Sequence, residues 1–354
     1  SQEINEPVVI SCTSSTATCN YWPPVAEAYY QGVPLIILTS DRNPSMLGQW
    51  EDQMIDQVGM YDRHVKKSVN LPIINDEDDI YYCERLINEA FLELEHNGKG
   101  PIHINIPMKK YNNSFNVKEL PDIKKITRIL NSDSNEVWKG KIEKLKNAKK
   151  ILIVCGQMSN VSDKLNNELN TFSEKYNCVI ASEYMSNVNV EKSVNLNIVM
   201  DARYATTKKV EELLPDIIIS YGGNVFSGVK EQLRKFYKKT EHWSIQEDGK
   251  VVDMFKSLQN IFECSPETFF EKCNLLSNES NDLKYYNKVN EYVKSVKYPD
   301  FPYSHVYAIK QMSERIPEDS VLHLSINDSI RIVNFFKLKK NIKVYANIGT
   351  HGID

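Results

Sequence analysis

The sequence lacks three signals that mark large classes of protein. No apolar run approaches the roughly 20 residues that a membrane-spanning helix needs. The charge is nearly balanced, with 43 basic and 47 acidic side chains and a net charge of -4, and no basic patch favours nucleic acid as a partner. The seven cysteines are scattered and never spaced as CxxC, which argues against a zinc site or a disulfide framework. We therefore predict a cytoplasmic protein with reduced thiols that binds neither membranes nor nucleic acid.

What the sequence does contain is an alternation of strand and helix patterns. Apolar, β-branched runs at residues 6–13 and 33–41 predict buried strands, and residues 23–32 between them predict a helix. Such a crossover implies a parallel sheet. An amphipathic helix over about residues 76–96 and a strand at 100–107 extend the same series.

A second alternating series follows a stretch without periodicity at residues 108–135, which we predict to be a surface linker. Further strands are predicted at 149–157, 178–183, 216–223, 242–246, 320–325 and 343–347. The pattern indicates an α/β fold with tandem doubly wound parallel-sheet domains, the first and last of them incomplete. The predicted parts are a first domain at 1–120, a central Rossmann-like domain at 136–265, a helical connector at 266–317 and the start of a third domain at 318–354.

A cluster of hydroxyl side chains follows the first predicted strand, in the stretch "SCTSSTATCNY" at residues 11–21. Loops at the carboxyl ends of parallel strands are where α/β folds bind ligands. Serine, threonine and asparagine also favour helix caps and turns for structural reasons alone. The residues themselves leave both interpretations open.

Two arginines also follow predicted strands. Arg42 lies in "TSDRNP", where it is suited either to fork onto a carboxylate or to form a surface turn with Asp41. Arg331 lies in "LSINDSIR", about one turn inside a helix that Asn327 or Asp328 can cap. Other motifs favour structural roles: "YGGN" at 221–224 lacks the spacing of a phosphate loop, and His64, His103 and His242 lack metal-ligand spacing.

Taken in order, five segments resemble the thiamine-diphosphate (ThDP) enzymes. The nearest variety is the menaquinone-pathway 2-succinyl-5-enolpyruvyl-6-hydroxy-3-cyclohexene-1-carboxylate synthase, together with relatives associated with polysaccharide gene clusters. The segments are "TSSTATCNYWPPVAEAYYQGVPLIILTSDRNP", "DQMI", "VGMY", "GPIHINIP" and "YANIGTHGID". By this resemblance the first domain would bind the cofactor's pyrimidine, and residues 318–354 would open the diphosphate-binding domain.

The resemblance implies a set of site residues and ligands. The cofactors would be ThDP and Mg²⁺, and the protein would be a homodimer or homotetramer whose small-molecule partners are a 2-oxo acid and an acceptor. Residues implied to contact the cofactor are Thr13, Ser14, Thr16, Asn20, Gly352 and Ile353. Residues implied to contact the substrates are Arg42, Gln53, Asn327, Arg331, Ile348 and His351.

Three of these positions depart from the family pattern. Ile348 stands where the synthase has an arginine that receives anionic isochorismate, His351 replaces a serine, and Asn327 stands near another substrate-facing serine. Losing that arginine removes a charge-assisted contact and favours a less anionic acceptor, such as a keto sugar.

The activity implied by the resemblance is decarboxylation of a 2-oxo acid with carboligation to the acceptor. The family's activating glutamate would lie upstream of Ser1, and its metal-binding GDG segment would lie downstream of Asp354. We therefore expect no catalytic or metal-binding residue within this chain, and no activity from the chain alone. The alternatives are a non-catalytic fragment that binds a nucleotide or serves assembly, and a simple ThDP decarboxylase or lyase.

Overall fold

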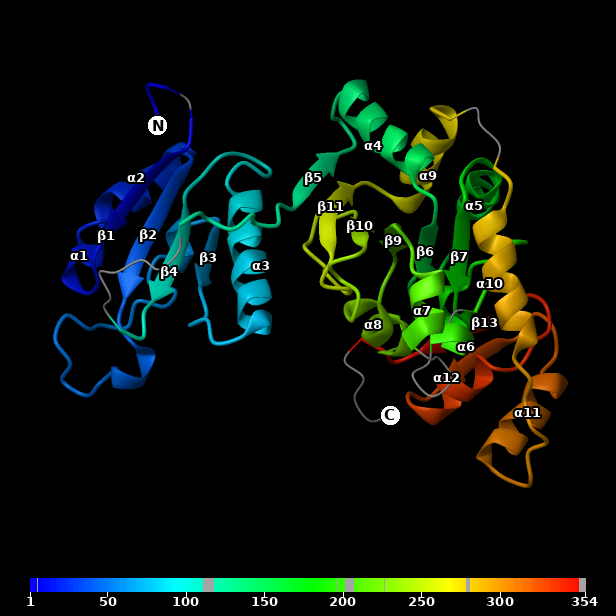
Figure 1. Cartoon of the computed structure of the whole chain (residues 1–354). Helices are drawn as coiled ribbons and strands as arrows, with labels where there is room; N and C mark the ends of the chain where they lie inside the picture. The colour runs from blue at the N-terminus through cyan, green and yellow to red at the C-terminus, as the bar shows by residue number, and fades with distance from the viewer. Residues whose placement is uncertain are drawn as a thin grey trace. The chain divides into compact units, whose positions relative to one another are not determined.

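The structure of the chain is a computed structural model. It describes residues 1–4, 6–110, 118–195, 197–200, 207–225, 227–277 and 281–349. The chain forms two compact units, Ser1–Thr127 and Arg128–Asp354, which are described separately below (Figure 1). Among the described helices, none has the length and apolar character that crossing a membrane requires.

The first unit is a four-stranded sheet with helices on both faces. Its strands lie in the order β1-β2-β4-β3, and every neighbouring pair is parallel. The strands are β1 Val8–Cys12, β2 Leu35–Asp41, β3 Lys67–Asn70 and β4 Ile102–Pro107. The helices are α1 Thr16–Cys19, α2 Trp22–Gln31 and α3 Glu77–Glu93, with short 3₁₀ turns η1 Pro44–Met46 and η2 Asp62–His64.

Alternating residues of β2 hold the two helical layers on opposite faces. Ile36 packs in the cluster that includes Leu86 of α3, whereas Leu35 and Ile37 pack in the cluster that includes Val25 of α2. A parallel sheet covered on both faces needs strands with apolar residues on both sides, as the first four residues of β2 provide. The predicted crossover of strand, helix and strand is therefore confirmed.

The second unit contains a seven-stranded sheet in the order β5-β11-β10-β9-β6-β7-β8 and a separate parallel pair, β12-β13. The strands are β5 Thr127–Leu130, β6 Ile151–Cys155, β7 Cys178–Ser182, β8 Ser193–Val194, β9 Ile217–Tyr221, β10 Glu241–Ile245, β11 Leu258–Glu263, β12 Val321–Leu324 and β13 Lys343–Ala346. The helices are α4 Asn135–Asn147, α5 Asp163–Lys175, α6 Asn197–Met200, α7 Thr207–Leu213, α8 Ser227–Arg234, α9 Pro266–Leu275, α10 Lys284–Ser295, α11 His305–Arg315 and α12 Asp328–Val333, with η3 Tyr184–Ser186.

The predicted linker at residues 108–135 is partly wrong. Its end forms β5, which pairs with β11 at the edge of the large sheet, and Ile129 within it is fully buried. Four residues are too few to show an alternating pattern, so no periodicity marks this strand. The α/β fold with parallel sheets is confirmed, while the four-part division into domains stays a prediction.

Candidate functional site

The hydroxyl cluster lies at the carboxyl edge of the first unit's sheet, directly after β1. Ser14 and Ser15 are buried, while Thr13, Thr16 and Asn20 are exposed. Ser15 precedes α1 with a backbone φ of 68° and ψ of -133°, a conformation that costs on the order of 1–3 kcal/mol for a residue other than glycine. Its side chain makes no capping hydrogen bond. Helix capping therefore does not account for Ser15.

A buried glutamine fixes this strained loop. The Oε1 atom of Gln57 accepts the backbone N–H of Ser15 at 2.6 Å. The Nε2 atom of Gln57 donates to the Ser40 carbonyl at 3.0 Å and to Oδ1 of Asn105 at 3.1 Å. Gln57 is 1% exposed, so these bonds replace water entirely and hold the loop after β1 to the ends of β2 and β4. Sequence reasoning missed Gln57 and Asn105, because a buried amide carries no pattern in the sequence.

Arg42 and Gln53, both predicted to contact substrate, are brought together at this edge. The Nη2 atom of Arg42 donates to Oε1 of Gln53 at 2.8 Å. The backbone N–H of Arg42 donates to Oδ1 of Asp41 at 2.7 Å, and Asp41 is itself buried. The arrangement orients a half-buried guanidinium whose fork geometry suits a carboxylate. The contact with Asp41 is local, as a turn would have it, whereas binding of a carboxylate by Arg42 stays a prediction.

His103 lies beneath this edge, in the core. Its Nε2 atom is 2.8 Å from the Thr39 hydroxyl, its Nδ1 atom is 3.1 Å from the Ser68 hydroxyl, and its ring packs edge-on against Tyr61. Burial lowers the pKa of His103 from 6.5 to about 4, and the charge of Asp62 opposes that shift only in part. A neutral, doubly hydrogen-bonded imidazole at this place is a structural residue.

The lowered pKa of His103 predicts an acid-sensitive first unit. As the pH falls below 6.5, the unfolded chain binds a proton that the folded state rejects until about pH 4, so stability is lost across that window. Between pH 6.5 and pH 5 the loss is about 2 kcal/mol. Hydrogen exchange of the β2 and β4 amides measures this loss, and His103→Gln should reduce it by that amount. Equal losses in the two proteins would contradict the assignment.

In the second unit, Asn327 and Arg331 lie where β12 leads into α12. Asn327 occupies the N-cap position with φ 65° and ψ -115°, and its side chain makes no capping hydrogen bond. Asn327 and Arg331 are both exposed. Asn327 thus repeats the strained geometry of Ser15 at the equivalent point of a second strand–helix junction. Strain of this kind clusters at ligand-binding sites.

The remaining predicted residues lie at the end of the chain. Ile348 is fully buried in an apolar cluster with Leu324, Ile330 and Val344, so it presents no polar group to a ligand. His351, Gly352 and Ile353 lie outside the described residues. Their assignments, like those of the other site residues, stay predictions.

The switch point of the large sheet is closed by the chain itself. The strand order reverses at β6, between β9 and β7, and the crevice at such a reversal is where α/β sheets commonly bind nucleotides. There the Gly223 N–H donates to the Gln157 carbonyl at 2.9 Å. The side-chain amides of Gln157 and Asn224 donate to the carbonyls of Ala346 and Ile348. The segment after β13 therefore occupies the crevice.

The residues at the first unit's edge fit one part of a ThDP site. The hydroxyls of Thr13 and Thr16 and the amide of Asn20 are exposed there, and no hydrogen bond is found for these side chains among the described residues. Such donors and acceptors suit an aminopyrimidine ring. The described residues hold no group of three or more histidine, cysteine or acidic side chains placed to bind a metal.

No family model matches the chain. Among curated proteins, it is 37% identical to the 2-succinyl-5-enolpyruvyl-6-hydroxy-3-cyclohexene-1-carboxylate synthase of Bacteroides thetaiotaomicron, over 98% of this chain and 62% of that protein. The synthase of the same name from Phocaeicola vulgatus is 33% identical over the same shares, and that from Cytophaga hutchinsonii is 29% identical over 100% of this chain and 64% of that protein. The chain thus spans about 62% of the length of the first two relatives. Sequence identity across nearly all of the chain supports the resemblance: the chain is homologous to proteins named 2-succinyl-5-enolpyruvyl-6-hydroxy-3-cyclohexene-1-carboxylate synthase, which are thiamine-diphosphate-dependent enzymes.

Proposed function

We propose that the whole protein decarboxylates a 2-oxo acid and joins the remaining carbon unit to an acceptor, using ThDP and Mg²⁺. The observation that carries the proposal is the pairing of Arg42 with Gln53 beside the hydroxyl loop, at one edge of a parallel sheet. When bound, ThDP supplies the electron sink that lets CO₂ leave, and the protein supplies orientation and charge. In keeping with the family, we propose an assembly of at least two copies.

The roles of the chain's own residues follow from their chemistry. Thr13, Ser14, Thr16 and Asn20 would hold the aminopyrimidine, with Gly352 and Ile353 meeting it from the other domain. The Arg42 guanidinium would bind the donor's carboxylate, and Gln53, which accepts a hydrogen bond from Nη2 of Arg42, would fix the orientation of the guanidinium. Arg331 would serve a second carboxylate, with Asn327 and His351 near the acceptor.

The name of the relatives suggests the donor. Their product carries a succinyl group, which is the unit left when a five-carbon 2-oxo diacid loses CO₂, so we propose 2-oxoglutarate as the donor here. For the acceptor we propose a compound less anionic than isochorismate, such as a keto sugar. Support comes from Ile348, which stands in place of an arginine and is buried among apolar side chains.

Arginine substitutions test the proposal. In the whole protein with ThDP and Mg²⁺, Arg42→Ala and Arg331→Ala should each slow CO₂ release from 2-oxoglutarate at least about tenfold, a barrier change of roughly 1.4 kcal/mol. Arg63→Ala is the matched control, because Arg63 is an exposed arginine of η2 in the same unit as Arg42. Its rate should equal that of the unaltered protein.

Unchanged CO₂ release in both Arg42→Ala and Arg331→Ala would overturn the assignment of the two residues. The acceptor is tested separately, by product analysis with isochorismate and with keto sugars. Adduct formed with isochorismate alone would refute the less anionic acceptor. Release of CO₂ with no adduct from any of them would favour a simple decarboxylase.

A further inference from the structure

A cavity of about 730 Å³ lies in the second unit, beyond the carboxyl ends of β6, β7 and β8. One wall consists of the loops that follow these strands, and the opposite wall is the segment 334–343, which leads from α12 to β13. We call it the lysine cavity, after Lys337, Lys339, Lys340 and Lys343, which belong to its lining. Its size falls within the range of about 300–1,000 Å³ typical of sites for small molecules.

The wall formed by 334–343 is held firmly against the sheet. Oδ1 of Asn187 accepts the Val344 N–H at 2.9 Å, and Nδ2 of Asn187 donates to the Val344 carbonyl at 3.0 Å. At the other end of the segment, Nδ2 of Asn195 donates to the Asn334 carbonyl at 2.7 Å. The cavity is therefore formed in advance, with both walls tied to the same sheet.

The charge of the lining favours an anion. Its four lysines face two acidic residues, Asp163 and Glu183, which leaves a formal excess of two positive charges. The Glu183 carboxylate is already engaged, because it accepts a hydrogen bond from Nδ2 of Asn197. The loop that starts helix α5 also lines the cavity, and the amino end of a helix adds a partial positive charge.

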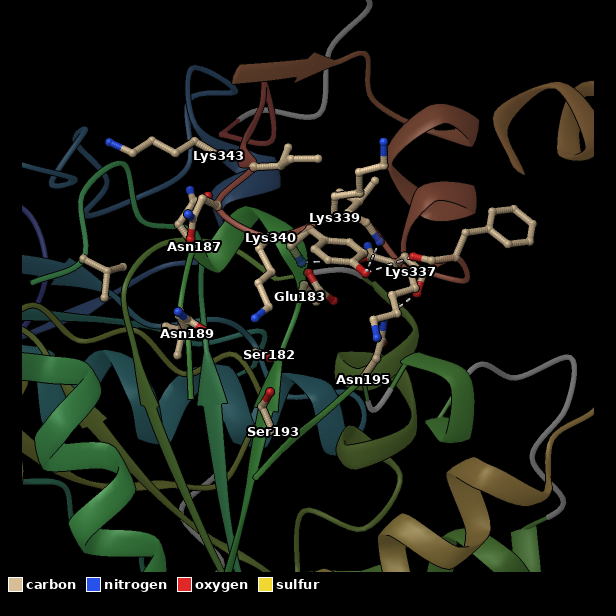
Figure 2. Close-up of a pocket in the computed structure, with 18 of the residues that line it drawn as sticks. Ser182, Glu183, Asn187, Asn189, Ser193, Asn195, Lys337, Lys339, Lys340 and Lys343 are labelled. Atoms are coloured by element: carbon tan, nitrogen blue, oxygen red, sulfur yellow. Dashed lines mark hydrogen bonds between the residues drawn. The ribbon is translucent and has the colours of Figure 1, made fainter. Parts of the chain in front are cut away.

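Lys340 is the lysine directed inward. Its side chain runs toward Ser182 and Ser193 at the strand ends, whereas Lys343 extends the opposite way (Figure 2). Within the described part of the chain, no hydrogen bond or ion pair is found for the Lys340 ammonium, the Ser182 hydroxyl or the Asn189 side-chain amide. These three groups have hydrogen-bonding capacity that a ligand can satisfy.

Part of the lining is apolar. Val161, Val188, Phe336 and Ile342 contribute to the walls, so the cavity combines one polar, cationic end with surfaces for a ring or an aliphatic body. Lysine ammonium groups with serine hydroxyls at strand ends are typical of phosphate recognition.

We propose that the lysine cavity binds a phosphorylated small molecule, with Lys340, Ser182 and Asn189 contacting the phosphate. None of the residues predicted to contact ThDP or the substrates belongs to this lining, and the proposal does not depend on the proposed reaction. Residues 346–348 occupy the crevice at the switch point. The lysine cavity, on the β6–β7 side of the sheet, is open to such a ligand.

Calorimetric titration of the whole protein tests the site. ADP and glucose 6-phosphate are the probes, in the presence of saturating ThDP and Mg²⁺ so that no diphosphate-binding site remains open, and adenosine and glucose are the uncharged controls. We expect at least one phosphorylated probe to bind while its uncharged control does not. Lys340→Gln should weaken that binding at least about tenfold, which corresponds to about 1.4 kcal/mol.

Lys343→Gln is the matched control, since it removes an exposed lysine of the same wall whose side chain extends away from the serines. Its affinity should fall much less than that of Lys340→Gln, because it lowers the charge of the lining without removing a group that contacts the phosphate. The proposal is overturned if neither phosphorylated probe binds, if the uncharged controls bind equally well, or if Lys340→Gln and Lys343→Gln weaken binding to the same degree.

Discussion

Replacing Gly156 with alanine should destabilise the second unit by about 3–5 kcal/mol, at the upper end of what single substitutions do. Gly156 directly follows β6, and a Cβ atom placed there would lie 2.1 Å from the carbonyl oxygen of Gly223 and 2.9 Å from that of Tyr221. Both obstacles are backbone atoms, which cannot rotate away as a side chain can. The loops after β6 and β9 would have to separate.

That separation would break the hydrogen bonds that close the switch point. The Gly156 N–H donates to the Tyr221 carbonyl at 2.9 Å, and the Gln157 N–H donates to the Asn224 carbonyl at 3.1 Å. Because Asn224 also holds the Ile348 carbonyl, the segment after β13 should loosen as well. Hydrogen exchange should show faster exchange at β6, β9 and β13 together.

Gly140→Ala is the control, because we expect it to change the stability of the second unit in the opposite direction. Gly140 is exposed inside helix α4, and nothing lies within 4 Å of a Cβ placed there. Alanine should raise the stability of the second unit by about 0.5–1 kcal/mol, since glycine is a poor helix former. Chemical denaturation of the two variants compares them directly. A Gly156→Ala protein as stable as the original would show that the two loops do not meet as described.

The contact between Gly156 and Gly223 illustrates what the sequence alone does not predict. The sequence favours a structural role for "YGGN", and Gly222 has a positive φ of 77°. The next glycine, Gly223, lies close to Gly156, which is far away in the sequence. This contact exists because β6 and β9 are neighbours in the sheet. No local pattern encodes such a contact. The long apolar strands and α3 were predictable because their periodicity is local, whereas β3, with only Val69 buried in its four residues, was not.

In the candidate site, too, some features were predictable from the sequence and others were not. The hydroxyl loop, Arg42 and Gln53 were predictable, because side-chain types at strand ends follow from the sequence and the family resemblance. The strain at Ser15 and Asn327 was not, since neither serine nor asparagine signals a positive φ as glycine does. The lysine cavity was also missed. It requires the 334–343 segment to lie against the loops after β6 and β7, which is a matter of tertiary packing.

Replacing Asn105 with alanine should destabilise the first unit by about 3–5 kcal/mol. The Oδ1 atom of this buried side chain accepts from Thr39 at 2.7 Å and from Gln57 at 3.1 Å. Its Nδ2 atom donates to Asp41 at 2.9 Å and to Asn70 at 2.8 Å. All four hydrogen-bonding positions of the amide are therefore used. Alanine would leave its buried partners without these hydrogen bonds and without water to replace them.

The effect should extend to the site, because two of these partners position it. Gln57 holds the strained N–H of Ser15, and Asp41 holds the backbone of Arg42. We therefore expect Asn105→Ala to weaken ThDP binding by the whole protein at least about tenfold, even at temperatures where the variant is still folded. Fluorescence titration with ThDP, alongside hydrogen exchange of β2 and β4, separates the change in affinity from the loss of stability.

Asn70→Ala is the matched control for Asn105. It removes an asparagine from the neighbouring strand, but Asn70 is exposed and gives the network a single acceptor. Water can replace that contact, so its cost should stay below about 1 kcal/mol and ThDP affinity should not change. Equal losses in the two variants would mean that the network stabilises the sheet without positioning the loop. A greater loss in Asn105→Ala, in both stability and affinity, identifies the buried amide as the element that fixes Ser15 and Arg42 at one edge of the sheet.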